Sequence, residues 1–181
     1  GNAVVTIESD EEQPEDELDT AALVDYSGYQ YSIVMVDCGR KYFNVDSINA
    51  IIDSASAVGM HYVMLAVGND GLRFLLNDMS LSFNGKEYSH EQVSKAIHAG
   101  NRAYDYRMSY DPKVDELTES DMNEIMRHAN SAGVQIIPLI NTPGHMDAIL
   151  YAMGSGKDAL NAVSNPAVFS SSKTTIDINN A

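Results

Sequence analysis

Three apolar runs, each ending abruptly in polar residues and glycine, are the feature of this sequence that most constrains its fold. The first and third runs are Ile33–Val36 and Val134–Ile140, and the second, Tyr62–Val67, lies between them. An unbroken apolar run of this length is typical of a parallel strand that is covered on both faces. We therefore predict three parallel strands, each buried on both sides.

Helical patterns separate these runs. Asn44 is placed to cap a helix that Gly59 ends. Thr118, with Asp121 three residues later, predicts a capped second helix that ends at Gly133. The residues expected to face the core are Val45, Ile48, Ile52 and Ala55 in the first helix and Met122, Ile125, Met126 and Ala129 in the second.

An insertion precedes the second of these helices. Asn84-Gly85 is typical of a type I′ hairpin turn, and Ser89 with Gln92 predicts a capping box. The helix that follows is expected to bury Val93, Ala96 and Ile97. The resulting order is α/β and suits either a barrel or a doubly wound sheet. In both folds, ligands bind beyond the carboxyl ends of the strands.

Charge and composition exclude several kinds of partner. The net charge is -15, and eight of the acids lie between Glu8 and Asp19 with no base among them, which predicts a flexible acidic linker. The rest is mildly acidic without a lysine or arginine cluster, so we expect neither nucleic acid nor a membrane surface as partner. No apolar run approaches the roughly 20 residues of a bilayer span. Cys38 is the single cysteine, and no spacing indicates a metal site or a cofactor.

Polar side chains that could bind a ligand follow each predicted strand. Arg40 can offer a planar fork of donors to two hydroxyls or a carboxylate, and Asp37 is close enough to orient it. His145 follows a Pro-Gly turn and can titrate near neutral pH or hydrogen-bond a carboxylate. Each has a structural alternative, since Arg40 could pair with an acid at the rim and His145 could cap a helix. Asn69 and Asp70 could be hydroxyl acceptors or merely turn formers.

Other chemistries find no support in the sequence. No serine lies in a G-x-S-x-G elbow, and Cys38 has no positioned base. The glycines after the second run lack the G-x-G-x-x-G order of a dinucleotide site. We interpret six methionines as core filler, namely Met35, Met60, Met64, Met79, Met122 and Met126.

Three strand-end segments are specific in combination. They are Asp37-Cys38-Gly39-Arg40-Lys41-Tyr42-Phe43, Gly68-Asn69-Asp70-Gly71-Leu72-Arg73-Phe74 and Asn141-Thr142-Pro143-Gly144-His145-Met146-Asp147. Together they resemble the first three strand ends of family 20 β-N-acetylhexosaminidases, closest to the streptococcal-type cell-surface exo-β-N-acetylglucosaminidases. The resemblance covers roughly residues 31–180. Residues 1–28 are then the flexible acidic linker that the composition predicts, and the resemblance implies that residues 29–181 are the N-terminal portion, about three βα units, of a (β/α)8 TIM-type barrel.

The resemblance also implies roles for these residues. Arg40 matches the arginine that holds the outer hydroxyls of a terminal N-acetylhexosamine, Asp70 lies in the acidic loop after the second strand, and His145 matches the histidine of the Pro-Gly-His turn. The substrate-binding set is Arg40, Asp70, His145, Asp37, Asn69 and Asn141. The implied partner is a glycan ending in N-acetylhexosamine, with no cofactor. The implied location is extracellular or the cell-wall surface of a Gram-positive bacterium.

The implied reaction is substrate-assisted. The 2-acetamido oxygen attacks the anomeric carbon, a glutamic acid protonates the leaving oxygen and the preceding aspartate orients the acetamido group. That Asp-Glu pair belongs after a fourth strand, and we expect it beyond Ala181. The Asp-Glu steps present, Asp10-Glu11, Asp16-Glu17 and Asp115-Glu116, follow no buried strand.

Three expectations follow from this comparison with the family. The chain itself carries no catalytic residue and should be inactive; if it were active, Asp147 or Asp177 would be the carboxylates to examine. Asn141 stands where many members carry aspartate, so we expect the histidine network to lack a charged partner. The alternatives are a non-catalytic aminosugar-binding module and a structural partial barrel, whose open edges would favour self-association.

Overall fold

Three parallel strands form the sheet that organises the chain. The computed structural model describes residues 25–104, 110–154, 157–163 and 175–177. The strands β1 (Ile33–Val36), β2 (Tyr62–Asn69) and β6 (Gln135–Ile140) lie in the order β1-β2-β6. Both neighbouring pairs are parallel. The α/β prediction is confirmed.

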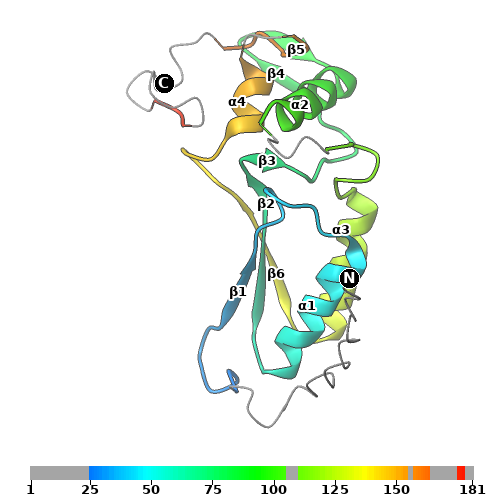
Figure 1. Cartoon of the computed structure of the whole chain (residues 1–181), viewed down its shortest axis with the longest axis vertical. Coiled ribbons are helices and arrows are strands. Elements are labelled where there is room, and N and C mark those ends of the chain that lie inside the picture. Colours follow the sequence, from blue (N-terminus) through cyan, green and yellow to red (C-terminus); the bar gives the residue numbers. More distant parts are fainter. Residues whose placement is uncertain (1–24, 105–109, 155–156, 164–174, 178–181) are drawn as a thin grey trace, which may run out of the picture.

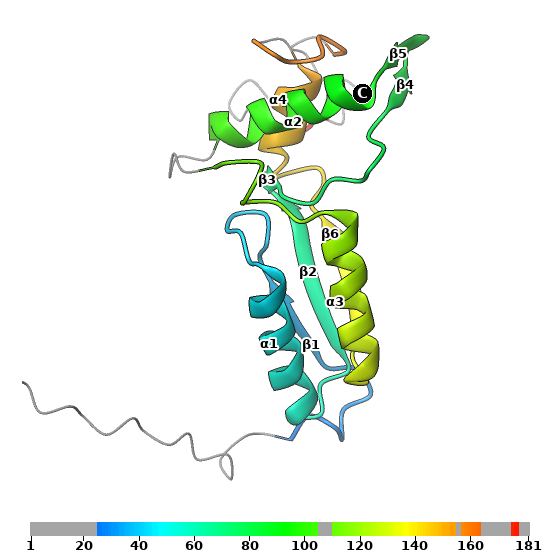
Figure 2. The ribbon, with the colours of Figure 1, turned by 90° about the vertical axis from the view of Figure 1, so that its right-hand side faces the viewer.

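Two helices cover one face of this sheet, as Figures 1 and 2 show. They are α1 (Val45–Ala57) and α3 (Glu119–Ser131). Asn44 caps α1 by accepting the Ser47 N–H at 2.9 Å, and Thr118 forms the expected capping box with α3. The core between helices and sheet includes Ile48, Ile52, Val63, Leu65 and Ile125, all at 0% exposure. Each such side chain contributes roughly 1.5 to 3 kcal/mol of burial free energy.

The opposite face of the sheet is open in the described part of the chain (Figure 1). Along β1, Val36 is buried against the helices, whereas Ile33 and Met35 are 48% and 60% exposed. The prediction of burial on both faces is therefore wrong for the first strand, because no described element lies over its second face. It is also wrong for the third strand, since no residue of β6 is fully buried and Ile140 is 54% exposed. Met35 is not core filler, because it is exposed on the open face of the first strand. Met126 is not core filler either, since it is 54% exposed on α3.

The insertion forms a second layer beyond the carboxyl ends of the strands (Figure 1). It contains β3 (Gly71–Leu72), the hairpin of β4 (Leu81–Phe83) and β5 (Lys86–Tyr88), and α2 (His90–Tyr104), which packs on α4 (Asp147–Met153). Asn84 and Gly85 have φ of 51° and 73°, as a type I′ turn requires. The Ser89 N–H donates to Gln92 Oε1 at 2.9 Å and the Gln92 N–H donates to Ser89 Oγ at 3.4 Å, which confirms the capping box. Val93, Ala96 and Ile97 are buried as predicted.

Strand β2 extends two residues beyond the predicted end at Val67. Gly68 still pairs with Ile140 on one side and with Leu72 on the other, so the chain reverses only at Asp70. The linker predicted for residues 1–28 lies largely outside the described residues. Within its last part, the Tyr26 N–H donates to the Val58 carbonyl at 2.8 Å. Among the described helices, none has the length and apolarity that a membrane span requires.

Candidate functional site

Arg40, Asp70 and His145 meet in one cluster at the carboxyl ends of the three strands. Arg40 Nε donates to Asp70 Oδ2 at 2.7 Å, and His145 Nδ1 lies 2.8 Å from Asp70 Oδ1. Arg40 Nη2 is 3.1 Å from the same imidazole nitrogen. The predicted juxtaposition is confirmed, although the three residues are up to 105 positions apart in the chain. Their contact with a sugar stays a prediction.

The geometry determines which way the imidazole presents its two nitrogens. Asp70 is the closer neighbour of Nδ1 and can only accept while ionised, so Nδ1 carries the proton and donates to it. Nε2 is then the nitrogen that His145 offers to an outside group. The side chains of His145 and Arg40 are 57% and 40% exposed, so both can meet a ligand.

Asp70 is the charged centre of the cluster. Burial alone would raise its pKa, but hydrogen bonds from Arg40, His145 and Asp147 and the charge of Arg40 outweigh burial and hold the pKa below its ordinary value. Asp70 thus stays ionised and is the charged partner of His145. The expectation that the histidine network lacks one is wrong, because that partner comes from the β2 loop rather than from position 141.

The backbone at the strand ends is bent to bring these side chains together. Asp70 and His145 both adopt left-handed conformations, with φ of 62° and 54°, and the Asp70 N–H donates to the His145 carbonyl at 2.7 Å. Such conformations cost free energy outside glycine and cluster at functional sites. Gly39 is required for a different reason: a Cβ there would lie 2.4 Å from the backbone nitrogen of Asn69. The turn that carries Arg40 therefore packs directly on the end of β2.

Beneath the cluster, a chain of polar side chains ties the three strand ends together. Asn69 Nδ2 donates to Asp37 Oδ2 at 2.7 Å, and Asn141 Nδ2 donates to Asn69 Oδ1 at 2.7 Å. Asp37 also accepts the Arg40 N–H at 3.1 Å. Asn69 is 6% exposed, so in this structure it braces the strand ends. The direct sugar contacts predicted for Asp37, Asn69 and Asn141 stay predictions.

Arg73 is a positioning residue that the sequence pattern did not indicate. It is 7% exposed, its Nε donates to the Gly39 carbonyl at 2.9 Å and its guanidinium lies 5.2 Å from the Tyr110 ring centroid. It therefore holds the turn that presents Arg40. The only sequence signal for this role was that Arg73 is a basic residue between the apolar residues Leu72 and Phe74. Cys38 in the same turn is 2% exposed, and burial raises the pKa of its thiol to about 12, which excludes a nucleophilic role.

The sequence indicated Asp147 only as a carboxylate to examine if the chain were active, but it lies directly against the cluster. It is the first residue of α4 and is 7% exposed, and the next residue, Ala148, donates its N–H to the Asp70 carbonyl at 2.9 Å. Burial, followed by a side-chain hydrogen bond with Asp70 and the negative charge of Asp70, raises the pKa of Asp147 to about 6. Asp70 and Asp147 are therefore two neighbouring carboxyl groups whose pKa values are driven apart.

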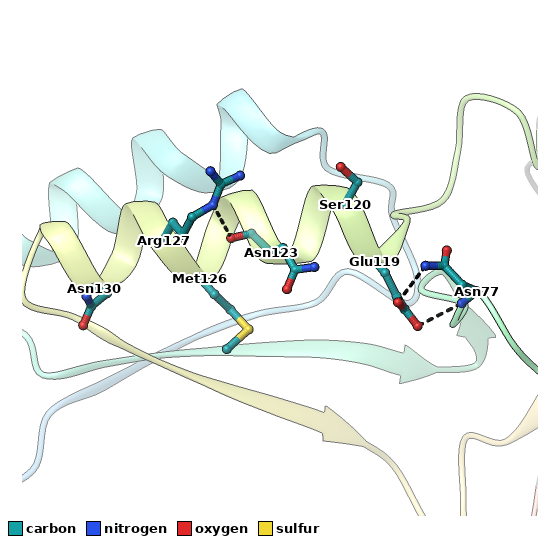
Figure 3. A pocket seen from close by; sticks show the side chains of 7 residues that line it. All are labelled: Asn77, Glu119, Ser120, Asn123, Met126, Arg127 and Asn130. Carbon is teal, nitrogen blue, oxygen red and sulfur yellow. Dashed lines mark hydrogen bonds between the residues drawn. The ribbon is translucent and has the colours of Figure 1, made fainter.

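A separate hollow lies along α3 and includes none of these residues (Figure 3). It is an open groove of about 660 Å³. Glu119 in it already accepts hydrogen bonds from the backbone and side chain of Asn77 at 2.9 and 2.8 Å. We assign the groove no role. The residues that line the groove are Asn77, Glu119, Ser120, Asn123, Met126, Arg127 and Asn130. In the described ranges, no group of three or more His, Cys, Asp or Glu side chains is placed to hold a metal ion.

Parallel strands alternating with helices, and a polar cluster beyond their carboxyl ends, define the class: an α/β protein of the kind whose ligand sites lie at that end of the strands. Comparison with known proteins identifies the family. Residues 29–180 match the sequence profile of glycosyl hydrolase family 20, catalytic domain, and the chain belongs to that family. Its fold is accordingly the N-terminal part of a TIM-type barrel.

Two solved structures of the pneumococcal exo-β-D-N-acetylglucosaminidase StrH are similar to this chain. They are 42% and 41% identical, each with a TM-score of 0.72 over 83% of this chain, and the match covers 34% and 35% of those chains. The N,N′-diacetylchitobiase of Vibrio harveyi is 25% identical over 155 residues, which is 82% of this chain and 17% of that protein. The chain thus spans about a third of the length of the StrH structures and less of the chitobiase.

Proposed function

We propose that this chain provides the part of a β-N-acetylhexosaminidase barrel that holds the terminal, non-reducing N-acetylhexosamine of a glycan. The observation that carries the proposal is the Arg40–Asp70–His145 cluster at adjoining strand ends. The similarity to StrH and to the chitobiase supports β-linked N-acetylglucosamine as the substrate, and we extend the proposed class to N-acetylgalactosamine. The similarity to the pneumococcal StrH structures supports an extracellular location, at the cell-wall surface of a Gram-positive bacterium.

Within this proposal, each residue of the cluster has a distinct task. Arg40 is anchored through Nε by Asp70, and its side chain is 40% exposed, so its guanidinium can also donate to neighbouring sugar hydroxyls in a charge-assisted manner. Asp70 fixes the tautomer of His145, whose Nε2 faces the ligand side. The hydrogen-bonded chain of Asp37, Asn69 and Asn141 holds the ends of the three strands together. Preorganised donors of this kind bind a sugar without a cost of reorganisation.

We propose that the complete enzyme acts by the substrate-assisted route, with an Asp-Glu pair outside this chain. The Asp-Glu step inside the described residues supports that assignment. Glu116 accepts from Tyr110 Oη at 2.8 Å and lies 3.1 Å from His98 Nε2, while Asp115 accepts the Asp111 N–H at 2.8 Å. Both carboxylates serve the insertion and not the cluster. The chain alone should therefore bind the aminosugar without cleaving it.

The binding of N-acetylglucosamine to the purified chain tests this proposal. Chemical shift changes on titration with the sugar should centre on the strand-end cluster. Arg40→Ala should abolish them, whereas Arg127→Ala should not, because Arg127 is an arginine on α3 outside the cluster. Shift changes centred away from the strand-end cluster, or binding that survives Arg40→Ala, would refute the proposal.

Turnover of an aryl N-acetylglucosaminide by the chain separates the binding function from a catalytic one. We expect none, because general acid catalysis supplies about 10² to 10⁴-fold and no carboxylic acid is assigned to it here. Release of aryl alcohol with saturation kinetics that Arg40→Ala abolishes would show that the chain is itself an enzyme. The acid would then have to be sought at Asp147 or Asp177.

A further inference from the structure

Asp147 has an unusual position for an ionisable group. It is 7% exposed at the start of α4, and its Oδ2 is buried and meets no hydrogen-bond donor in the described part of the chain. The side chain that it does meet is the carboxylate of Asp70. Two ionised carboxylates cannot satisfy one another, because both are acceptors only. One proton between the two groups removes this conflict.

The surroundings decide which of the two carries that proton. Arg40 Nε and His145 Nδ1 both contact the oxygens of Asp70, at 2.7 and 2.8 Å, and both favour its ionised form. Asp147 has no such cation in direct contact within the described residues. The proton therefore belongs to Asp147, whose hydroxyl can donate to the Asp70 carboxylate.

We propose that Asp147 is a positioning residue of the sugar site: as a neutral acid it donates a hydrogen bond to Asp70 and holds that carboxylate between Arg40 and His145. The backbone supports this arrangement, since the Ala148 N–H donates to the Asp70 carbonyl at 2.9 Å and locks α4 to the β2 loop. The role in sugar binding rests on the function proposed above. The proton between Asp147 and Asp70 is independent of that function.

Two charged or titratable side chains act on the Asp147 carboxyl, namely Asp70 from the end of β2 and His145 from the loop before α4. Arg40 contacts Asp70. The helix α2 meets α4 at Gly100, where a Cβ would lie 2.4 Å from the Ala148 carbonyl oxygen, so backbone rather than a charged side chain forms that contact. Burial and the charge of Asp70 both favour the protonated form of Asp147.

Carboxyl ¹³C NMR of the purified chain tests the shared proton without any ligand. We expect the Asp147 carboxyl to titrate near pH 6 and that of Asp70 to titrate below its ordinary pKa. Asp147→Asn keeps a donor to Asp70 and should preserve the low Asp70 midpoint. Asp147→Ala removes the donor and should raise that midpoint relative to Asp147→Asn. Asp147 titrating near pH 4 would overturn the proposal, as would an Asp70 midpoint that is the same in both variants. If the alanine variant does not fold, the Asp147 midpoint in the unsubstituted chain decides.

N-acetylglucosamine titrations of the same samples test the role in binding. Asp147→Asn should bind as the unsubstituted chain does at about pH 5, and Asp147→Ala should bind several-fold more weakly. Equal affinity of the two variants would refute a positioning role. If the unsubstituted chain binds no sugar while its carboxyl groups titrate as expected, the proposed function fails and the shared proton stands.

Discussion

Replacing Asp147 with asparagine should remove a loss of stability that the unsubstituted chain suffers as the pH rises. The folded state raises the pKa of Asp147 from 3.8 to about 6, so between these values the folded chain binds more protons than the unfolded chain. The stability that this provides is complete below the unfolded pKa and is lost as the pH rises through about 6. The asparagine side chain would make the same hydrogen bond to Asp70 at every pH, because an amide does not ionise.

The size of the effect follows from the shift. A change of about two pKa units corresponds to about 3 kcal/mol at about 1.4 kcal/mol per unit. Asp147 is 7% exposed, but the Asp70 side chain beside it is 24% exposed, so solvent reduces the coupling between them. As the pH rises from about 4 to about 8, we therefore expect the free energy of unfolding of Asp147→Asn to gain about 1 to 3 kcal/mol relative to that of the unsubstituted chain.

Thermal and urea unfolding at both pH values measure this gain, which should appear as a rise in Tm of roughly 2 to 4 °C for each kcal/mol. Asp46→Asn is the matched control, because Asp46 is also in the first turn of a helix but is exposed. That control should show no gain at high pH. Parallel pH dependences of the unsubstituted chain and Asp147→Asn would refute the reasoning.

Three further predictions concern the strand ends and the sheet. In the enzyme extended through all eight strands, Arg40→Ala should cost about 2 to 4 kcal/mol of transition-state stabilisation, measured as kcat/KM on terminal β-N-acetylglucosaminides, because a charge-assisted donor pair is lost; unchanged activity would show that Arg40 is only structural. Gly39→Ala should destabilise the chain by about 1 to 3 kcal/mol in urea unfolding, because its Cβ would lie 2.4 Å from Asn69 N, whereas Gly28→Ala, with nothing within 4 Å, should change stability by less than about 0.5 kcal/mol. The chain should self-associate through the open sheet face, and Met35→Lys should weaken this in light scattering; a strictly monomeric unsubstituted chain at high concentration argues against the idea.

Local patterns were enough to predict the elements and the place of the site. The capping residues Asn44 and Thr118 and the turn at Asn84-Gly85 act within a few neighbouring residues, so their sequence signals transferred directly into structure. The rule that ligands bind at the carboxyl ends of parallel strands then predicts that Arg40, Asp70 and His145 gather at one edge of the sheet. The hydrogen-bonding groups and charges of these three residues are known from their residue types alone.

The sequence by itself thus determined the α/β order, the family and the residues that gather at the strand ends. The tertiary structure decided what those residues do to one another. Asp70 rather than position 141 supplies the charge beside His145, Arg73 holds the Arg40 turn, and Asp147 meets Asp70 in a buried contact. It also decided that Met35 is exposed. The physical reason is that burial, hydrogen-bond direction and pKa depend on groups that lie far apart in the sequence, and only the folded chain places them within a few ångströms.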